Sequence, residues 1–190
     1  MKIGVLAIQG DFEAHRRKLD QMGVDAVLVK TAGEMAGLDG LILPGGESTT
    51  HLKLLTEEGI LGAVAERARQ GMAIFGTCAG AILLAKEVKN PPQPSLGLVD
   101  MTVVRNAYGR QLDSCVLEAP TTLSENPLEM VFIRAPVIER VGPGVEILAR
   151  REGKPVLVRQ GRVLAATFHP ELSGDSTIHS YFLKMVGNGK

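Results

Sequence analysis

Apolar and amphipathic stretches alternate through the first half of the chain. Four nearly continuous apolar runs predict buried strands, at residues 3–8, 24–29, 38–43 and 72–75. Three amphipathic stretches predict helices between these runs, at residues 12–22, 47–55 and 60–69. Asp11 is expected to cap the first helix. This alternation predicts the α/β class, with a doubly wound, mainly parallel sheet flanked by helices.

The second half of the chain has more strands and more turns. Residues 90–95 contain three prolines and are predicted to form a loop. Short apolar segments predict strands at residues 99–104, 114–117, 131–133, 145–149, 156–158 and 163–166. Gly153 and Gly161 lie where hairpin turns are expected, so antiparallel strands are predicted in this half. A final helix is expected over residues 177–186, and residues 1–190 are predicted to form a single domain.

The formal charge of the chain is balanced. Its 190 residues include 21 Lys plus Arg and 21 Asp plus Glu, so no global field attracts nucleic acid or an anionic membrane. The N-terminal apolar run is too short for a signal peptide, and no segment has the apolar length of a membrane span. Two cysteines are too few for a disulfide framework. We therefore expect a cytoplasmic protein that binds neither nucleic acid nor membranes.

Residues 76–80 (GTCAG) join a predicted strand to a small-residue helix expected at residues 79–85. A strand, an abrupt turn and a helix lift one side chain clear of a sheet edge, and glycines make room for the turn. A helix that begins at Cys78 also favours its thiolate, the nucleophilic form. The alternative is a small buried apolar residue, which is the interpretation for Cys115 in a strand. A nearby base would decide between these interpretations.

Four histidines are candidates for that base. His15 and His179 lie within predicted amphipathic helices, where a surface or half-buried histidine is the ordinary case. His51, near the start of a helix, is ambiguous. His169 follows the apolar strand at residues 163–168, so it is expected at the carboxyl edge of the sheet, where functional groups collect in doubly wound folds.

Glu171 stands two residues beyond His169. In an extended chain, side chains at i and i+2 project to the same side, and Pro170 between them keeps the backbone stiff. The carboxylate would then fix the imidazole tautomer so that the other ring nitrogen faces the thiol. A surface turn with an incidental histidine is the alternative for this segment alone. Cys78, His169 and Glu171 together favour a nucleophile, its base and the group that orients the base.

Gly45 and Gly46 follow a predicted strand and precede a helix. Backbone amides in such a turn face the same crevice, where Gly46 N–H and Ala79 N–H would stabilise an oxyanion. A plain strand–helix turn with Ser48 as the helix cap is the alternative. A phosphate loop is disfavoured because the Lys-Ser/Thr ending of a Walker sequence is absent.

Several of these segments resemble the class I (triad) glutamine amidotransferases. The resemblance rests on residues 43–49 (LPGGEST), 76–80 (GTCAG) and 168–171 (FHPE). A narrower resemblance is to the glutaminase subunit of the pyridoxal 5′-phosphate synthase complex. It rests on residues 8–10 (IQG), 45–50 (GGESTT), 105–111 (RNAYGRQ) and 132–136 (FIRAP). These segments span nearly the whole chain, and no motif position departs from the pattern.

The resemblance implies an enzyme that hydrolyses L-glutamine to L-glutamate and ammonia with Cys78, His169 and Glu171 as its triad. It implies substrate contacts from further residues: Gly46, Glu47, Ser48, Arg105, Ile133 and Arg134. An arginine also suits the α-carboxylate of glutamine on chemical grounds, although a solvated surface charge is the ordinary interpretation of a single arginine. The chemistry requires neither a metal ion nor another cofactor.

The resemblance also implies a partner: a pyridoxal 5′-phosphate synthase subunit that receives the ammonia in a heteromeric complex. We hypothesise that docking of this subunit organises the loop at Gly45 and Gly46, with help from Gln9. Two alternatives remain open at the sequence level. One is a glutaminase subunit for another amidotransferase pathway, and the other is a cysteine hydrolase, redox protein or binding module of similar fold.

Overall fold

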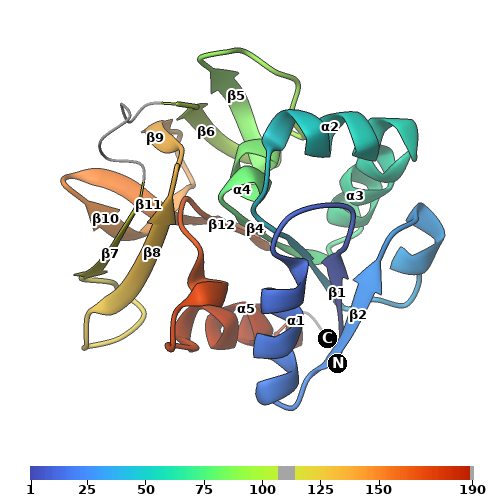
Figure 1. Cartoon of the computed structure of the whole chain (residues 1–190), viewed down its shortest axis with the longest axis horizontal. Helices are drawn as coiled ribbons and strands as arrows, with labels where there is room; N and C mark the ends of the chain where they lie inside the picture. The colour runs from blue at the N-terminus through green and yellow to red at the C-terminus, as the bar shows by residue number, and fades with distance from the viewer. Residues whose placement is uncertain (107–113, 189–190) are drawn as a thin grey trace.

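The computed structural model of the protein describes residues 1–106 and 114–188. In this part of the chain, seven strands form a central sheet in the order β10-β11-β12-β4-β3-β1-β2 (Figure 1). Their bounds are β1 (Lys2–Leu6), β2 (Asp25–Val29), β3 (Gly40–Leu43), β4 (Ala73–Thr77), β10 (Glu146–Arg151), β11 (Lys154–Gln160) and β12 (Val163–Ala166). Strands β2, β1, β3, β4 and β12 run parallel, whereas β10 and β11 form antiparallel pairs at one side. The predicted fold class is confirmed.

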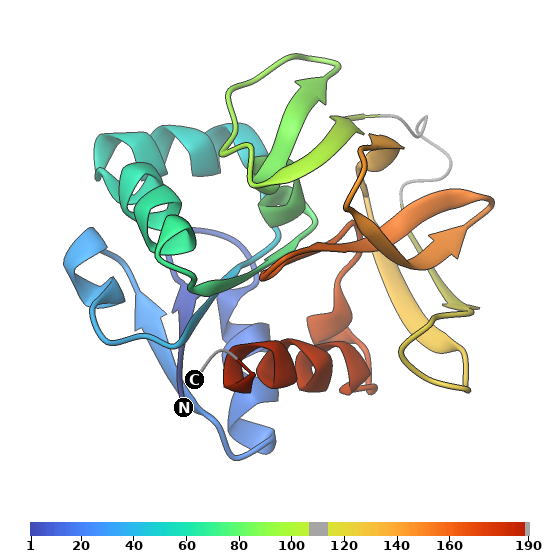
Figure 2. The same cartoon turned by 180° about the vertical axis from the view of Figure 1, so that it is seen from behind.

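Helices cover both faces of this sheet (Figures 1 and 2). One face carries α1 (Phe12–Gln21) and α5 (Thr177–Gly187). The other carries α2 (Ser48–Glu57), α3 (Ile60–Arg69) and α4 (Ala79–Leu84). Successive residues of β4 contribute to opposite cores, since Ile74 packs with α2–α4 and Phe75 with α5. This two-sided burial explains why the parallel strands are continuously apolar.

Two smaller sheets extend the fold beyond β12 in the described residues. One contains β5 (Ala85–Lys89), β6 (Val99–Val104) and β9 (Val137–Val141), and the other contains β7 (Ser114–Ala119) and β8 (Leu128–Ile133). The β6–β9 and β7–β8 pairs are antiparallel, as expected for this half. Strands β5 and β9 were not predicted, because exposed charged residues such as Glu87 and Arg140 interrupt their apolar pattern.

The sheet order brings distant segments of the chain to one edge. Strands β12, β4, β3 and β1 are neighbours, and their carboxyl ends lead to His169, Cys78, Gly46 and Asp11 respectively. The short 3₁₀ helix η2 (Pro170–Leu172) follows β12, and a second, η1 (Ala32–Met35), lies between β2 and β3. None of the helices in residues 1–106 and 114–188 has the length and apolar character needed to cross a membrane.

Candidate active site

Cys78 occupies a strained turn between β4 and α4. Its backbone has φ 49° and ψ −104°, a conformation that non-glycine residues rarely adopt. The Cys78 amide donates to the carbonyl of Ala166, and its carbonyl accepts from Ile82. A Cβ on Gly80 would lie 2.0 Å from the Leu43 carbonyl oxygen, so only glycine fits there. The predicted elbow therefore exists, and it presents the thiol at the sheet edge.

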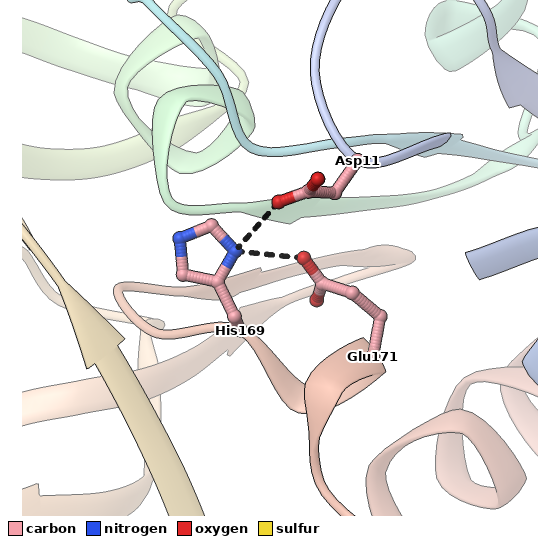
Figure 3. A group of neighbouring side chains, drawn as sticks. All are labelled: Asp11, His169 and Glu171. Carbon is pink, nitrogen blue, oxygen red and sulfur yellow. Dashed lines mark hydrogen bonds and ion pairs between the residues drawn. The ribbon is translucent and has the colours of Figure 1, made fainter. Parts of the chain in front are cut away.

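His169 and Glu171 form a buried hydrogen-bonded pair (Figure 3). His169 Nδ1 lies 2.7 Å from Glu171 Oε1. The two side chains do not meet through an extended chain, as the i, i+2 spacing led us to expect. Pro170 begins the 3₁₀ turn η2, and this turn places the Glu171 carboxylate next to the His169 imidazole. The expected contact is present, but the local geometry that was expected to produce it is wrong.

Both members of this pair have shifted pKa values. Burial by itself lowers the pKa of His169, but hydrogen bonds to Cys78 and Glu171 outweigh burial and raise it to about 10. Burial raises the pKa of Glu171, but the neighbouring imidazoles of His15 and His169 and the His169 hydrogen bond leave it below its usual value. The hydrogen-bonded pair of Glu171 and His169 therefore stands beside the thiol of Cys78.

Asp11 approaches the same imidazole from the solvent side. Its Oδ2 lies 4.0 Å from His169 Nδ1, and a dashed line marks this contact in Figure 3. Asp11 was expected to cap α1, but its side chain makes no capping hydrogen bond. Ligand atoms of Asp11, His169 and Glu171 lie within 4.8 Å of one another, a group that could hold a metal ion. The short hydrogen bond from His169 Nδ1 to Glu171 accounts for the closest contact in this group without a metal.

A pocket of about 200 Å³ opens over Cys78. Its lining includes most of the predicted site residues: Gly46, Glu47, Ser48, Cys78, Arg105, Ile133, Arg134 and His169. Ala79 and Glu171 are absent from the lining and lie buried behind it. Four other lining residues were not predicted: Asp11, Ile82, Asn106 and Pro136. Residues 107–111, which belong to a segment that carries the narrower resemblance, fall outside the described residues.

Glu47, rather than Ser48, caps helix α2. The Glu47 carboxylate accepts hydrogen bonds from the amides of Thr49 and Thr50, at 3.0 and 2.7 Å. Partial burial raises its pKa, but these amide hydrogen bonds lower it to about 2. Arg105 lies 3.4 Å from the same carboxylate and donates to Thr49 Oγ1. Glu47 therefore faces the pocket as a fixed negative charge beside a positive one.

The glycines of the β3–α2 loop are required by close packing. A Cβ on Gly45 would lie 2.4 Å from His169 Cε1 and 3.3 Å from Cys78 Cβ. Gly46 has φ +150°, which disfavours other residues. The side-chain amide of Gln9, in the orientation that satisfies both groups, donates to the Glu47 carbonyl and accepts from the Glu47 amide. The end of β1 thereby holds this loop against the thiol.

Two histidines differ from their sequence-based interpretation, and a third, His51, was left ambiguous. His15, His51 and His179 are all buried, so the expectation of surface or half-buried histidines is wrong for His15 and His179. His51 Nε2 lies 2.8 Å from the Gln9 carbonyl oxygen. Cys115, in contrast, packs against the core from β7, as expected. The position of a histidine on the apolar stripe of a helix was the signal in the sequence for its burial. Only the tertiary structure shows what each ring contacts.

Comparison with known proteins places this architecture among the glutamine amidotransferases. A solved structure described as glutamine amidotransferase superposes with a TM-score of 0.93 at 50% identity, covering 97% of this chain and 98% of that one. A putative GMP synthase protein from Thermoplasma acidophilum shares the fold, with a TM-score of 0.75, 20% identity and coverage of 100% and 95%. The chain is an enzyme of the glutaminase type with the class I amidotransferase fold.

The particular family follows from the sequence match. The model of the SNO glutamine amidotransferase family matches residues 5–188, and the chain belongs to this family. It is 56% identical to the pyridoxal 5′-phosphate synthase subunit PdxT of Koribacter versatilis, over 100% of this chain and 97% of that protein. It is 50% identical to the subunit of the same name from Deinococcus radiodurans, with 98% of each chain covered.

Proposed function

We propose that the chain hydrolyses L-glutamine through a Cys78–His169–Glu171 triad and delivers the ammonia to a pyridoxal 5′-phosphate synthase for vitamin B6 synthesis. One observation carries the triad: the thiol at a strained strand–helix turn faces an imidazole whose far nitrogen is held by a buried carboxylate. These are the relations that a nucleophile, its base and an orienting group require.

The chemistry follows from these positions. The Cys78 thiolate attacks the side-chain carboxamide carbon of glutamine, and the carbonyl electrons move to oxygen. His169 then gives its proton to the departing ammonia as the C–N bond breaks and a γ-glutamyl thioester remains. His169 next takes a proton from water, the hydroxide adds to the thioester, and glutamate leaves as the thiolate re-forms.

The pocket lining supplies roles for the remaining residues. Gly46 N–H and Ala79 N–H are proposed to stabilise the oxyanion. Arg105 or Arg134 would pair with the α-carboxylate of glutamine and Glu47 with its α-ammonium group. Ser48 and Ile133 complete the substrate contacts. This division uses the opposite charges of Glu47 and Arg105, which already lie side by side.

The names of the relatives support the destination of the ammonia. The relatives in Koribacter versatilis and Deinococcus radiodurans are named as subunits of pyridoxal 5′-phosphate synthase. We therefore propose a heteromeric complex with a synthase subunit. Docking of that subunit is proposed to change the backbone conformation at Gly46 through Gln9. The Gln9 side-chain amide is hydrogen-bonded to the backbone of the neighbouring Glu47.

Ammonia release from glutamine, with and without a pyridoxal 5′-phosphate synthase subunit, tests the proposal. The Cys78→Ala variant is expected to lose at least about 10⁴-fold in kcat, because no other group replaces the nucleophile. Cys115→Ala, which removes the other thiol, should retain wild-type activity. Hydrolysis that survives in Cys78→Ala rules out the triad. Activation by another amidotransferase synthase, but not by this one, rules out the vitamin B6 assignment.

A further inference from the structure

Two buried histidines lie behind the proposed triad, and the proposed mechanism assigns no task to either. His15 on α1 and His179 on α5 are fully inaccessible to solvent. Phe75 of β4 packs edge-on against both rings. Because a polar side chain is costly to bury without hydrogen bonds, the partners of these two rings indicate what they do.

The two histidines connect α5 to the triad carboxylate. His15 Nδ1 lies 3.1 Å from His179 Nε2. On the other side of the same ring, His15 Nε2 lies 3.1 Å from Thr77 Oγ1 and 3.3 Å from Glu171 Oε2. The other carboxylate oxygen, Oε1, pairs with His169. A continuous path of buried polar contacts therefore runs from His179 to the imidazole that faces the thiol.

Burial favours the neutral form of both histidines. Burial lowers the pKa of His15, as do His169 and Lys18, while Glu171 and Asp11 raise it, and the balance is a lowered pKa. Burial, His15 and Lys18 together hold the pKa of His179 well below its usual value.

The neutral state fixes where the protons lie. His15 Nε2 is hydrogen-bonded to Thr77 Oγ1 and also lies beside Glu171 Oε2, and a proton on this nitrogen is favoured because a bare lone pair would face the carboxylate. A neutral imidazole has one donor and one acceptor, so His15 Nδ1 accepts from His179 Nε2–H. His179 Nδ1 is then a bare acceptor, and within residues 1–106 and 114–188 it has no hydrogen-bond partner. In this arrangement the proton of each ring lies on the side nearer to Glu171.

Glu171 needs a support of this kind. It is carried by a three-residue 3₁₀ helix, and the next residue, Leu172, is exposed. Oε2 of Glu171 makes no well-aligned hydrogen bond in the described part of the chain, and His15 is the donor beside it. Lys18, one turn further along α1, donates to the Ser173 carbonyl just beyond η2. Helix α1 therefore contacts this turn at two points.

We propose that His15 and His179 are positioning residues of the glutaminase site, with His179 fixing the tautomer of His15 and His15 holding the Glu171 carboxylate charged and aligned with His169. This inference rests on the proposed triad, which it extends from three residues to five. It assigns the first-turn face of α1 and the start of α5 to the active site, although neither helix lines the pocket.

A pair of His15 variants separates positioning from packing. Gln in place of His15 can put an amide N–H near the original Nε2, whereas Leu keeps comparable bulk and removes the donor. With the synthase subunit present, His15→Leu should lower kcat about tenfold with KM unchanged. It should also move the acidic limb of kcat/KM, and the pH dependence of Cys78 alkylation by iodoacetamide, upward by about one pH unit. His15→Gln should restore both.

His179→Leu provides a second route if His15→Leu does not fold, as judged by thermal unfolding. It should produce the same shifts with smaller amplitude. The inference is wrong if the Leu variants fold and keep the wild-type kcat and the wild-type acidic limbs. It is also wrong if His15→Leu and His15→Gln lose kcat equally while the acidic limbs of both stay at the wild-type pH. Failure of the triad itself is distinguished by Cys78→Ala in the same assay, since retained hydrolysis there contradicts the proposed function whatever the His15 variants do.

Discussion

Two groups of residues in and behind the pocket differ in burial. We call His169, Glu171, His15 and His179 the buried wall, although only His169 lines the pocket, and Glu47, Arg105 and Arg134 the rim. The Glu171 side chain is 0% exposed, whereas the side chains of Glu47 and Arg105 are 51% and 12% exposed. The core therefore fixes the groups proposed to do chemistry, while the groups proposed to bind substrate project from loops at the surface.

This difference has an electrostatic reason. In the low-dielectric interior, a hydrogen bond or charge is worth more and is screened less, so the buried wall can hold shifted pKa values. A partly exposed ion pair such as Arg105–Glu47 is weaker and more sensitive to salt than a buried one. That weakness would let the pair exchange partners with the zwitterionic substrate proposed to bind here. Alignment and binding are thus assigned to different environments within one site.

The largest expected effect comes from the buried wall. Glu171→Gln should lower kcat about 10²–10⁴-fold, because a neutral amide no longer stabilises the His169 imidazolium or fixes its tautomer. Asp11→Asn is the matched control, since Asp11 faces the same imidazole nitrogen from solvent, at 4.0 Å. It should change kcat less than about threefold. Steady-state glutaminase kinetics with the synthase subunit measure both. Equal losses of kcat in the two variants would mean that the buried Glu171 and the exposed Asp11 contribute equally to the reaction.

A smaller effect is expected at the rim. Arg105→Gln should raise KM for glutamine about tenfold and leave kcat nearly unchanged, because a substrate carboxylate loses a charged partner in ground and transition states alike. Arg140→Gln removes a surface arginine that pairs with Asp100 and should change neither constant. A fall in kcat for Arg105→Gln without a change in KM would place this residue with the wall rather than the rim.

The smallest effect is on the pH dependence of folding. Burial lowers the pKa of His15, His51 and His179 in the folded protein. Below about pH 6.5 these histidines therefore bind more protons in the unfolded chain than in the folded protein. The contribution of these three histidines to the free energy of unfolding therefore falls as the pH falls. His169, with its pKa raised to about 10, has the opposite sign: its stabilisation is present below about pH 6.5 and is lost as the pH rises through about 10.

Urea unfolding between about pH 7.5 and pH 5.5 measures this dependence. His179→Phe should flatten the acidic slope by up to about 1.4 kcal/mol per pH unit, because one proton-binding group is removed from the unfolded state. Phe182→Leu, a buried change on the same helix, should lower stability at every pH without altering the slope. Identical slopes for wild type and His179→Phe would show that this histidine already titrates in the folded protein.

Local sequence pattern predicted the parts of the site that lie at strand ends. The elbow at Cys78 and the glycine turn after β3 each follow a short apolar run, and such runs predict strands whose carboxyl ends meet. The fold class followed from the same alternation. The 3₁₀ turn at Glu171 was missed because a Pro-Glu pair is compatible with both extended and turned backbone.

The buried wall was predicted less well than the rim. His15 and His179 lie on amphipathic helices, and periodicity reports only which face of a helix is covered. It does not report that two such faces, far apart in the sequence, meet behind one carboxylate. Glu47 shows the converse limit: its role as a helix cap depends on where α2 begins, and boundaries are the least certain part of a sequence-based prediction.

Strand β12 carries a consequence for how the enzyme is made. It is the last of the described strands along the chain, yet it lies between β4 and β11 in the sheet. Until this strand has emerged from the ribosome, β4 has an open edge beside the Cys78 turn, and open edges invite pairing with other chains. Its insertion completes the sheet and brings His169, the proposed base, beside Cys78 in the same step. Under the proposed mechanism, a chain that lacks this strand cannot yet hydrolyse glutamine.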